Sequence, residues 1–131
     1  MESRGNNIEP MYVIAGIICE KKGDSISNEL LYDGLLNVGE NHDDFIGENL
    51  RTDKSIEEEQ EEIIAETIDE TIFKLINRGG LIPFDNGQNF RFNFGILKEL
   101  YKKLDSRFEE GVKEAAQELD EFEKKPLKIS F

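Results

Sequence analysis

The chain contains a single cysteine, Cys19, and a single histidine, His42. One cysteine forms no disulfide within the chain, which points to a reducing compartment, so we expect a cytoplasmic protein. One histidine excludes the metal motifs that need two, such as zincins and di-iron bundles. Glycine-rich phosphate loops and the GxSxG nucleophile motif are also absent. We therefore expect a protein that is not an enzyme, with no catalytic residue, cofactor or metal.

Long apolar runs are lacking as well. The longest, Met11–Cys19, has nine residues, whereas a membrane-spanning helix needs roughly 20. No basic segment precedes it, as one would in a secretory signal, so we expect no association with a membrane. The length of 131 residues and the apolar share of 37% are those of one globular domain. We expect this domain at 11–131, after a flexible polar tail at 1–10.

Positive charge is scarce. The chain has 29 acidic residues against 16 Lys and Arg, a net charge of −13. Direct binding of nucleic acid is therefore not expected, because it depends on cations that neutralise phosphates. Residues 11–78 hold 17 acids and 6 bases (net −11), whereas residues 79–131 hold 10 acids and 9 bases (net −1). An acidic half of this kind suits a positively charged partner.

The best-defined element is an acidic helix that starts at Ser55. Ser55 and Glu58 have the spacing of a capping box. Apolar residues at helical spacing then form one stripe: Ile64, Ile68, Ile72, Leu75 and Ile76. Gly79-Gly80 predicts the end of the helix just after Asn77, since glycine adopts the left-handed cap at little cost.

Residues 81–95 predict a β-hairpin. Asn86-Gly87 is a strong turn signal, and Pro83 predicts an edge strand for the first arm. Phe90, Phe92 and Phe94 alternate with polar residues, which places them on one face of the second arm. We interpret that face as core, because a base-stacking platform would need a basic groove.

Two N-terminal segments carry mixed signals. Met11–Cys19 is apolar at both parities, so its period does not separate a buried strand from a buried helix. Its β-branched residues and the turn-like sequence after it favour a strand, with a short helix as the alternative. Ser27–Leu36 predicts a helix capped by Ser27 and weakened by Gly34, and residues 37–54 predict a connecting loop.

A helical region opens at Asn93 or Gly95 and reaches about Lys124. Its apolar residues follow a heptad-like pattern: Leu97, Tyr101, Leu104, Phe108, Val112, Ala115, Leu119 and Phe122. A second capping box at 106–109 leaves open one helix or two, broken near Asp105. Residues 127–131 alternate and allow a last short strand. The heptad-like stripe also allows a seam between two copies, hence a homodimer.

Together these elements predict an α+β fold: a small antiparallel sheet with a central hairpin, packed against a long acidic helix and a long C-terminal helix. The block 57–70 has eight acids and no cation. We assign the binding of a partner protein with a basic surface to six of them: Glu57, Glu58, Glu61, Glu62, Glu66 and Asp69. The expected function is an acidic interaction module that inhibits or regulates a nucleic-acid-handling protein, in the manner of phage-encoded inhibitors or immunity proteins.

Two other functions stay open. A structural or assembly factor would oligomerise through the C-terminal helix. A metal-dependent nucleotide hydrolase would hold Mg²⁺ on carboxylate pairs such as Glu58/Glu61 and Glu66/Asp69. The second is disfavoured, because such sites usually draw carboxylates from two facing helices, and acids three or four residues apart on one helix mainly repel each other.

Overall fold

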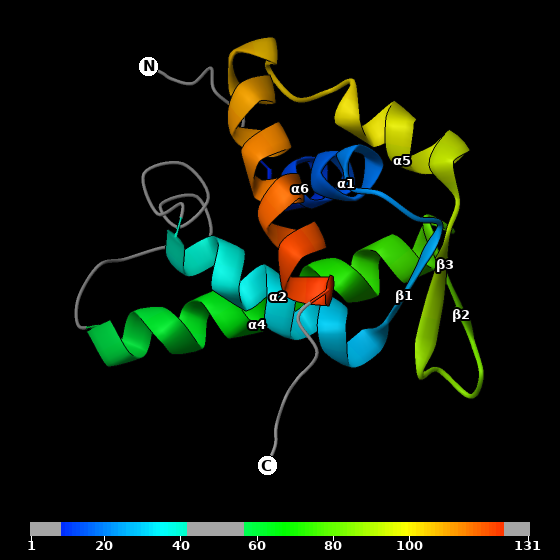
Figure 1. The fold of residues 1–131 in the computed structure, drawn as a ribbon, viewed down its shortest axis with the longest axis horizontal. Coiled ribbons are helices and arrows are strands. Elements are labelled where there is room, and N and C mark those ends of the chain that lie inside the picture. Colours follow the sequence, from blue (N-terminus) through cyan, green and yellow to red (C-terminus); the bar gives the residue numbers. More distant parts are fainter. Residues whose placement is uncertain (1–8, 42–56, 125–131) are drawn as a thin grey trace.

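The computed structural model describes residues 9–41 and 57–124. The first range contains helix α1 (Pro10–Glu20), strand β1 (Ser25–Ser27) and helix α2 (Asn28–Asn41). The second contains α4 (Glu57–Asn77), β2 (Leu81–Phe84), β3 (Asn89–Phe92), α5 (Phe94–Tyr101), the 3-10 helix η2 (Ser106–Phe108) and α6 (Glu109–Lys124). Figure 1 shows a helical body with a small sheet at one end. The predicted α+β class is confirmed.

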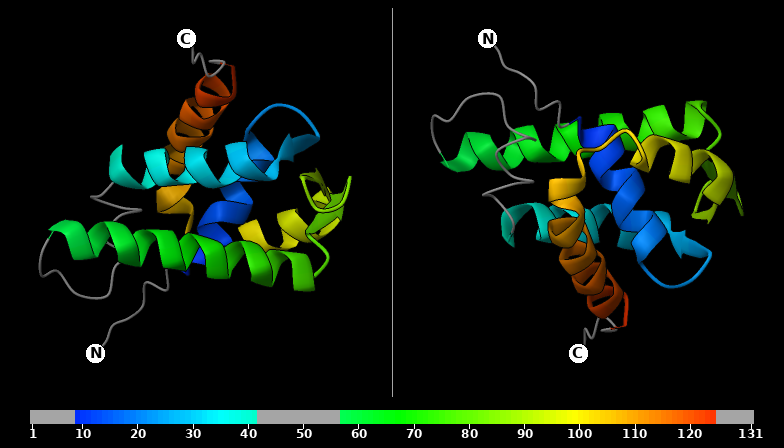
Figure 2. Two further views of the ribbon diagram at one scale, coloured as in Figure 1. Left: turned by 90° about the horizontal axis from the view of Figure 1, so that it is seen from below. Right: turned by 90° about the horizontal axis from the view of Figure 1, so that it is seen from above.

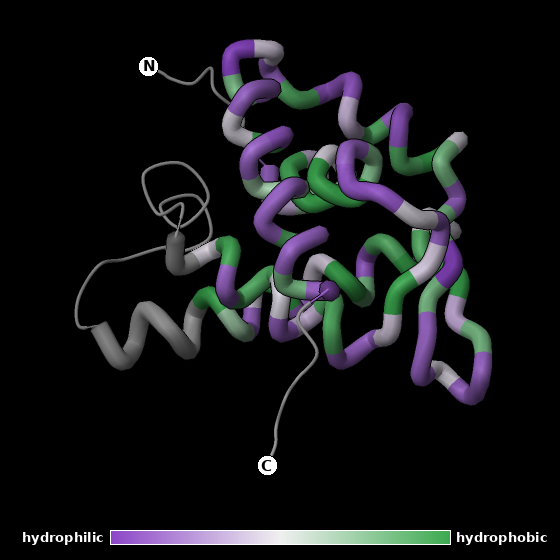
Figure 3. The backbone as a smooth tube through the Cα atoms, in the orientation of Figure 1, coloured by the Kyte–Doolittle hydropathy of each residue, from purple (hydrophilic) through white to green (hydrophobic). Residues whose placement is uncertain are grey.

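Helix α1 occupies the middle of the molecule and contacts α4, α5 and α6 (Figure 1). Figure 3 shows it as a hydrophobic segment among more polar ones, and its buried residues lie on most of its circumference: Met11, Val13, Ile14, Ala15, Gly16, Ile17 and Ile18. The strand predicted for Met11–Cys19 is therefore wrong, and the alternative helix forms. A helix satisfies its own backbone N–H and C=O groups, so it can be surrounded by other helices without strand partners.

The sheet is antiparallel, with the strand order β1-β3-β2. The predicted hairpin supplies β2 and β3, and its turn spans residues 85–88. Within that turn Asp85, Asn86 and Gly87 all have positive φ, a conformation that Asn, Asp and Gly tolerate better than other residues. Strand β2 lies at the edge of the sheet, as Pro83 predicted. Strand β1 was not predicted, because its three residues acquire strand geometry only by pairing with β3.

The aromatic residues of the hairpin divide between two elements. Phe90 and Phe92 are buried on the inner face of β3. Phe94 is half-buried and is the first residue of α5, so the prediction of three Phe residues on one strand is wrong for this one. Its ring still meets the ring of Phe92 edge-on, with centroids 5.8 Å apart.

Helix α4 confirms the long acidic helix. Ile64, Ile68, Ile72 and Leu75 are buried, and Ile76 packs against the same core. Its C-terminus has the predicted glycine cap: Gly79 has a φ of 84°, its N–H bonds Ile76 O, and Gly80 N–H bonds Leu75 O. These two bonds form a Schellman motif, which satisfies carbonyls that the helix leaves unpaired.

Helix α2 begins where predicted and continues further. Ser27 Oγ accepts a hydrogen bond from Leu30 N–H at 3.1 Å, which is the predicted N-cap. The helix ends at Asn41, so the first residues of the predicted 37–54 loop are helical instead. Gly34 marks close packing rather than weakness, because a Cβ at this position would clash with the side chain of Leu119 in α6.

The C-terminal region forms two helices, α5 and α6, which settles the alternative left open near Asp105. The cap lies one residue earlier than predicted, since Asp105 Oδ1 accepts a hydrogen bond from Arg107 N–H at 3.1 Å. Val112, Ala115 and Leu119 are buried in α6, which packs on α1 and α2. This part of the heptad-like stripe is therefore used inside one chain.

Several predictions concern residues outside the described ranges. They are the N-terminal tail over residues 1–8, the His42 loop, the Ser55 capping residue and the last short strand at 127–131. Residue 10 was assigned to the tail but is the first residue of α1. Among residues 9–41 and 57–124, no helix combines the length and apolarity that crossing a membrane requires.

Candidate partner-binding surface

Helix α4 presents acids on its solvent side. Glu66, Asp69 and Glu70 are all exposed. Their spacing of three and four residues places them on the side of the helix opposite the isoleucine stripe. Of the six residues predicted to bind a partner, Glu66 and Asp69 are thus exposed on one helix. The other four (Glu57, Glu58, Glu61 and Glu62) belong to the first turns of α4, and their side chains lie outside the described part.

Helix α2, which packs beside α4, also carries exposed acids. The left view of Figure 2 shows α2 and α4 side by side and antiparallel, with the hairpin at the start of α2 and the end of α4. Glu29 and Asp33, one turn apart near the start of α2, are exposed. We name Glu29, Asp33, Glu66, Asp69 and Glu70 the acidic face. In the described ranges, no cation forms an ion pair with these five residues.

A cleft of about 600 Å³ opens between these elements. The first turns of α2, the middle of α4 and the hairpin turn line it with these residues: Ser27, Asn28, Glu29, Tyr32, Asp69, Gly87, Gln88 and Asn89. Two carboxylates from different helices, several amide groups and one phenol ring therefore share one opening. None of these lining residues is Lys or Arg, so the cleft suits a cationic group.

Phe73 lies on the solvent side of α4 and is 63% exposed, which is unusual for such a large apolar side chain. It follows Asp69 by four residues and Glu70 by three, so both acids are its neighbours on the helix surface. Its exposure was not predicted, although Phe73 stands outside the isoleucine stripe and the helical period alone could have indicated it. Aromatic residues, Phe among them, are enriched where proteins contact each other.

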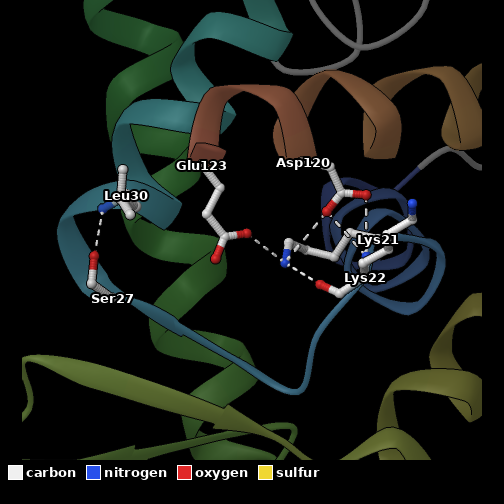
Figure 4. Close-up of polar contacts among 6 residues, drawn as sticks. All are labelled: Lys21, Lys22, Ser27, Leu30, Asp120 and Glu123. Atoms are coloured by element: carbon white, nitrogen blue, oxygen red, sulfur yellow. Dashed lines mark hydrogen bonds and ion pairs between the residues drawn. The ribbon is translucent and has the colours of Figure 1, made fainter. Parts of the chain in front are cut away.

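A different arrangement of charges joins α1 to α6, as Figure 4 shows. Lys21 Nζ is 2.9 Å from Glu123 Oε1 and 3.8 Å from Asp120 Oδ1, and it donates a hydrogen bond to Lys22 O at 2.6 Å. The N–H of Lys22 donates to Asp120. We name these four residues the Lys21 cluster. The Lys21 residue is only 5% exposed, and its ammonium also lies 5.5 Å from the centre of the Phe92 ring.

The cluster serves the fold rather than a partner. A buried ammonium is tolerated only when carboxylates and hydrogen bonds replace its water, and the Lys21 cluster supplies both. Sequence reasoning missed it, because Lys21 follows the apolar run in what looked like a turn. Its carboxylates come from α6, about 100 residues later.

Cys19 of α1 lies near Tyr101, the last residue of α5. Burial raises the pKa of the Cys19 thiol to about 11, which keeps it protonated at neutral pH. Burial and the hydrogen bond that the Tyr101 hydroxyl donates to Glu20 Oε2 (2.9 Å) raise the pKa of Tyr101. Neither group is activated for nucleophilic chemistry, since activation requires the thiolate or phenolate form.

The hydrolase alternative requires carboxylates that gather around a metal ion. Among the side chains that the structure describes (residues 9–39 and 64–124), no three His, Cys, Asp or Glu gather closely enough to hold a metal ion. Comparisons with known proteins add no constraint: no family model, no curated protein and no solved structure matches this chain.

Proposed function

We propose that this protein is an acidic interaction module that covers a basic surface of a partner protein, and that the partner handles nucleic acid. The observation that carries the proposal is the acidic face. Its carboxylates are exposed, and no cation of the described chain pairs with them. Charges left unpaired in this way attract an oppositely charged surface and steer its approach.

The class of partner follows from the chemistry of basic surfaces. Inside cells, such surfaces mostly belong to proteins that bind phosphate backbones through Lys and Arg. Carboxylates that cover them compete with the phosphates, so the module acts as an inhibitor or regulator by mimicking a polyanion. Phage-encoded inhibitors and immunity proteins work in this general way, which is a likeness of character only. A cytoplasmic location belongs to the same proposal and is supported by the lone, half-buried Cys19.

The test is a charge reversal with a matched control. Glu66→Lys with Glu70→Lys changes two exposed acids one turn apart on α4, and Glu110→Lys with Glu114→Lys does the same on α6. The tagged protein first captures its partner from the native host, and mass spectrometry identifies it. Stopped-flow association with the purified partner is then measured at low and high salt.

We expect the α4 reversal to slow association by at least about tenfold. Added salt should bring the association rates of the α4 variant and the wild type closer together, because salt screens exposed charges over about 8–10 Å. The α6 control should have a much smaller effect, although it changes the net charge equally. If both variants associate equally slowly, the net charge of the protein and not the acidic face determines the association rate. An unchanged association rate in the α4 variant would refute the proposal.

A second candidate, the assembly factor, is favoured by the outer face of the sheet. Ile82 and Phe84 of β2 are both at least 36% exposed, and β2 is an edge strand. Edge strands with apolar side chains are prone to pair with other chains. Sedimentation of the purified protein tests this: a dimer that Ile82→Lys dissociates would support the assembly factor, and a monomer at all concentrations would exclude self-assembly through this face.

A further inference from the structure

We infer that the cleft between α2, α4 and the hairpin turn receives an arginine side chain of the partner, while Phe73 packs on an apolar residue of the same segment. This inference rests on the proposed function and specifies its contact. The partner would then present a basic amphipathic segment rather than a uniformly charged surface.

The lining of the cleft favours a guanidinium group. Glu29 and Asp69 supply carboxylates from two helices on one opening, and a planar guanidinium with five donors can bond to more than one carboxylate or amide oxygen at once. Tyr32 adds an aromatic ring, on which guanidinium stacks more readily than ammonium. Asn28, Gln88 and Asn89 add side-chain carbonyl acceptors.

Phe73 gives the surface its apolar part. Asp69 both lines the cleft and lies one turn before Phe73 on α4, so the cleft and the exposed ring are separated by about 6 Å along the helix surface. Neighbouring side chains of one partner segment span such a distance. A ring that is exposed in the free protein and covered in the complex is the usual form of an interface hot spot.

The probe is a short amphipathic peptide with arginine at its charged positions and leucine at its apolar positions. Matched peptides carry citrulline in place of arginine, which keeps the shape and removes the charge, or lysine, which keeps the charge and removes the planar fork. Binding is measured by titration calorimetry. Amide shifts in ¹⁵N-labelled protein locate the contact.

We expect amide shifts to concentrate at the residues that line the cleft and around Phe73. The arginine peptide should bind at least about tenfold more tightly than the lysine peptide, and the citrulline peptide should not bind measurably. Glu29→Gln, Asp69→Asn and Phe73→Ser should each weaken the arginine peptide by about tenfold or more. The matched controls Glu114→Gln and Ile82→Ser, which lie outside the cleft, should leave the affinity within about twofold.

Equal binding of the lysine and arginine peptides, or equal losses in cleft and control variants, would overturn the inference. The proposed function fails separately. If the α4 charge reversal slows association with the native partner but Glu29→Gln and Phe73→Ser do not, the acidic face binds the partner without an arginine in the cleft. If the peptide shifts amides at the cleft but the α4 reversal leaves association with the native partner unchanged, the cleft binds arginine and the proposed function is wrong.

Discussion

The Lys21 cluster and the acidic face treat charge in opposite ways. In the cluster, one cation lies almost out of reach of water and shares two carboxylates of α6. On the acidic face, five carboxylates stand in solvent, and no cation of the described ranges pairs with them. Burial makes pairing obligatory because an unpaired charge loses its hydration, whereas exposure leaves pairing optional. Charges of the first kind stabilise the fold, and charges of the second kind remain available to a partner.

The largest effect on stability should come from comparing a buried aromatic residue with an exposed one. Phe92 is 6% exposed and contacts both Phe94 and Lys21, so Phe92→Ala should lower the free energy of unfolding by about 3–5 kcal/mol. Phe73→Ala removes the same ring from the acidic side and should cost less than about 0.5 kcal/mol. Urea unfolding measures both. Similar losses in the two variants would place Phe73 in the core and break the comparison.

Removal of the buried cation is the direct test of the Lys21 cluster. Lys21→Ala should lower the free energy of unfolding by about 3 kcal/mol, because Asp120 and Glu123 lose their partner and the lysine stem loses its packing. Lys22→Ala is the control, since the Lys22 side chain is exposed and only its backbone joins the cluster. Thermal unfolding should separate the two variants clearly. A Lys21 variant as stable as the control would mean that the ion pair contributes nothing net.

The packed interface between α2 and α6 should be destabilised by a single added methyl group. Gly34→Ala should cost about 1–3 kcal/mol, because its Cβ meets Leu119 in a packed core. Alanine is nevertheless the better helix former by about 1 kcal/mol, so the sign of the change decides between packing and propensity. Gly95→Ala is the control, because its Cβ meets only Asn93 Oδ1 at 3.4 Å. Calorimetric melting measures the stability of both variants. A Gly34→Ala variant more stable than the wild type would show that α2 and α6 move apart easily.

The smallest effect concerns the pH dependence of Cys19. Because burial raises the pKa of the thiol from its ordinary value of 9.0 to about 11, alkylation by iodoacetamide should be slow at pH 8 and accelerate as the pH approaches 11. The raised pKa means that folding favours the protonated thiol. Its stabilising contribution is therefore complete below pH 9 and is lost as the pH rises from 9 to about 11. Full reactivity of the folded protein near pH 8 would contradict the burial of this thiol.

The candidate site was only partly accessible from the sequence. The run of acids predicted an exposed face on α4, and Glu66 and Asp69 lie there. Glu29 and Tyr32 of the cleft were not assigned to it, because their proximity to Asp69 arises from the packing of α2 on α4. Local sequence gives the side of a helix on which a residue lies, but it does not give the neighbouring helix that faces it.

The sequence by itself determined the elements whose signals are local. Helical spacing and the Gly79-Gly80 cap defined α4, and the Asn86-Gly87 signal located the hairpin turn. These signals act within a few residues, through backbone conformation and short hydrogen bonds. They hold whatever the chain packs against.

Tertiary structure decided everything that depends on distant partners. The apolar run of α1 is compatible with a strand or a helix, and it becomes a helix where α4, α5 and α6 enclose it. Strand β1 exists because β3 pairs with it. Lys21 can be buried because α6 brings Asp120 and Glu123 to its ammonium. In each case the deciding free energy comes from desolvation and pairing across the fold, which no window of sequence contains.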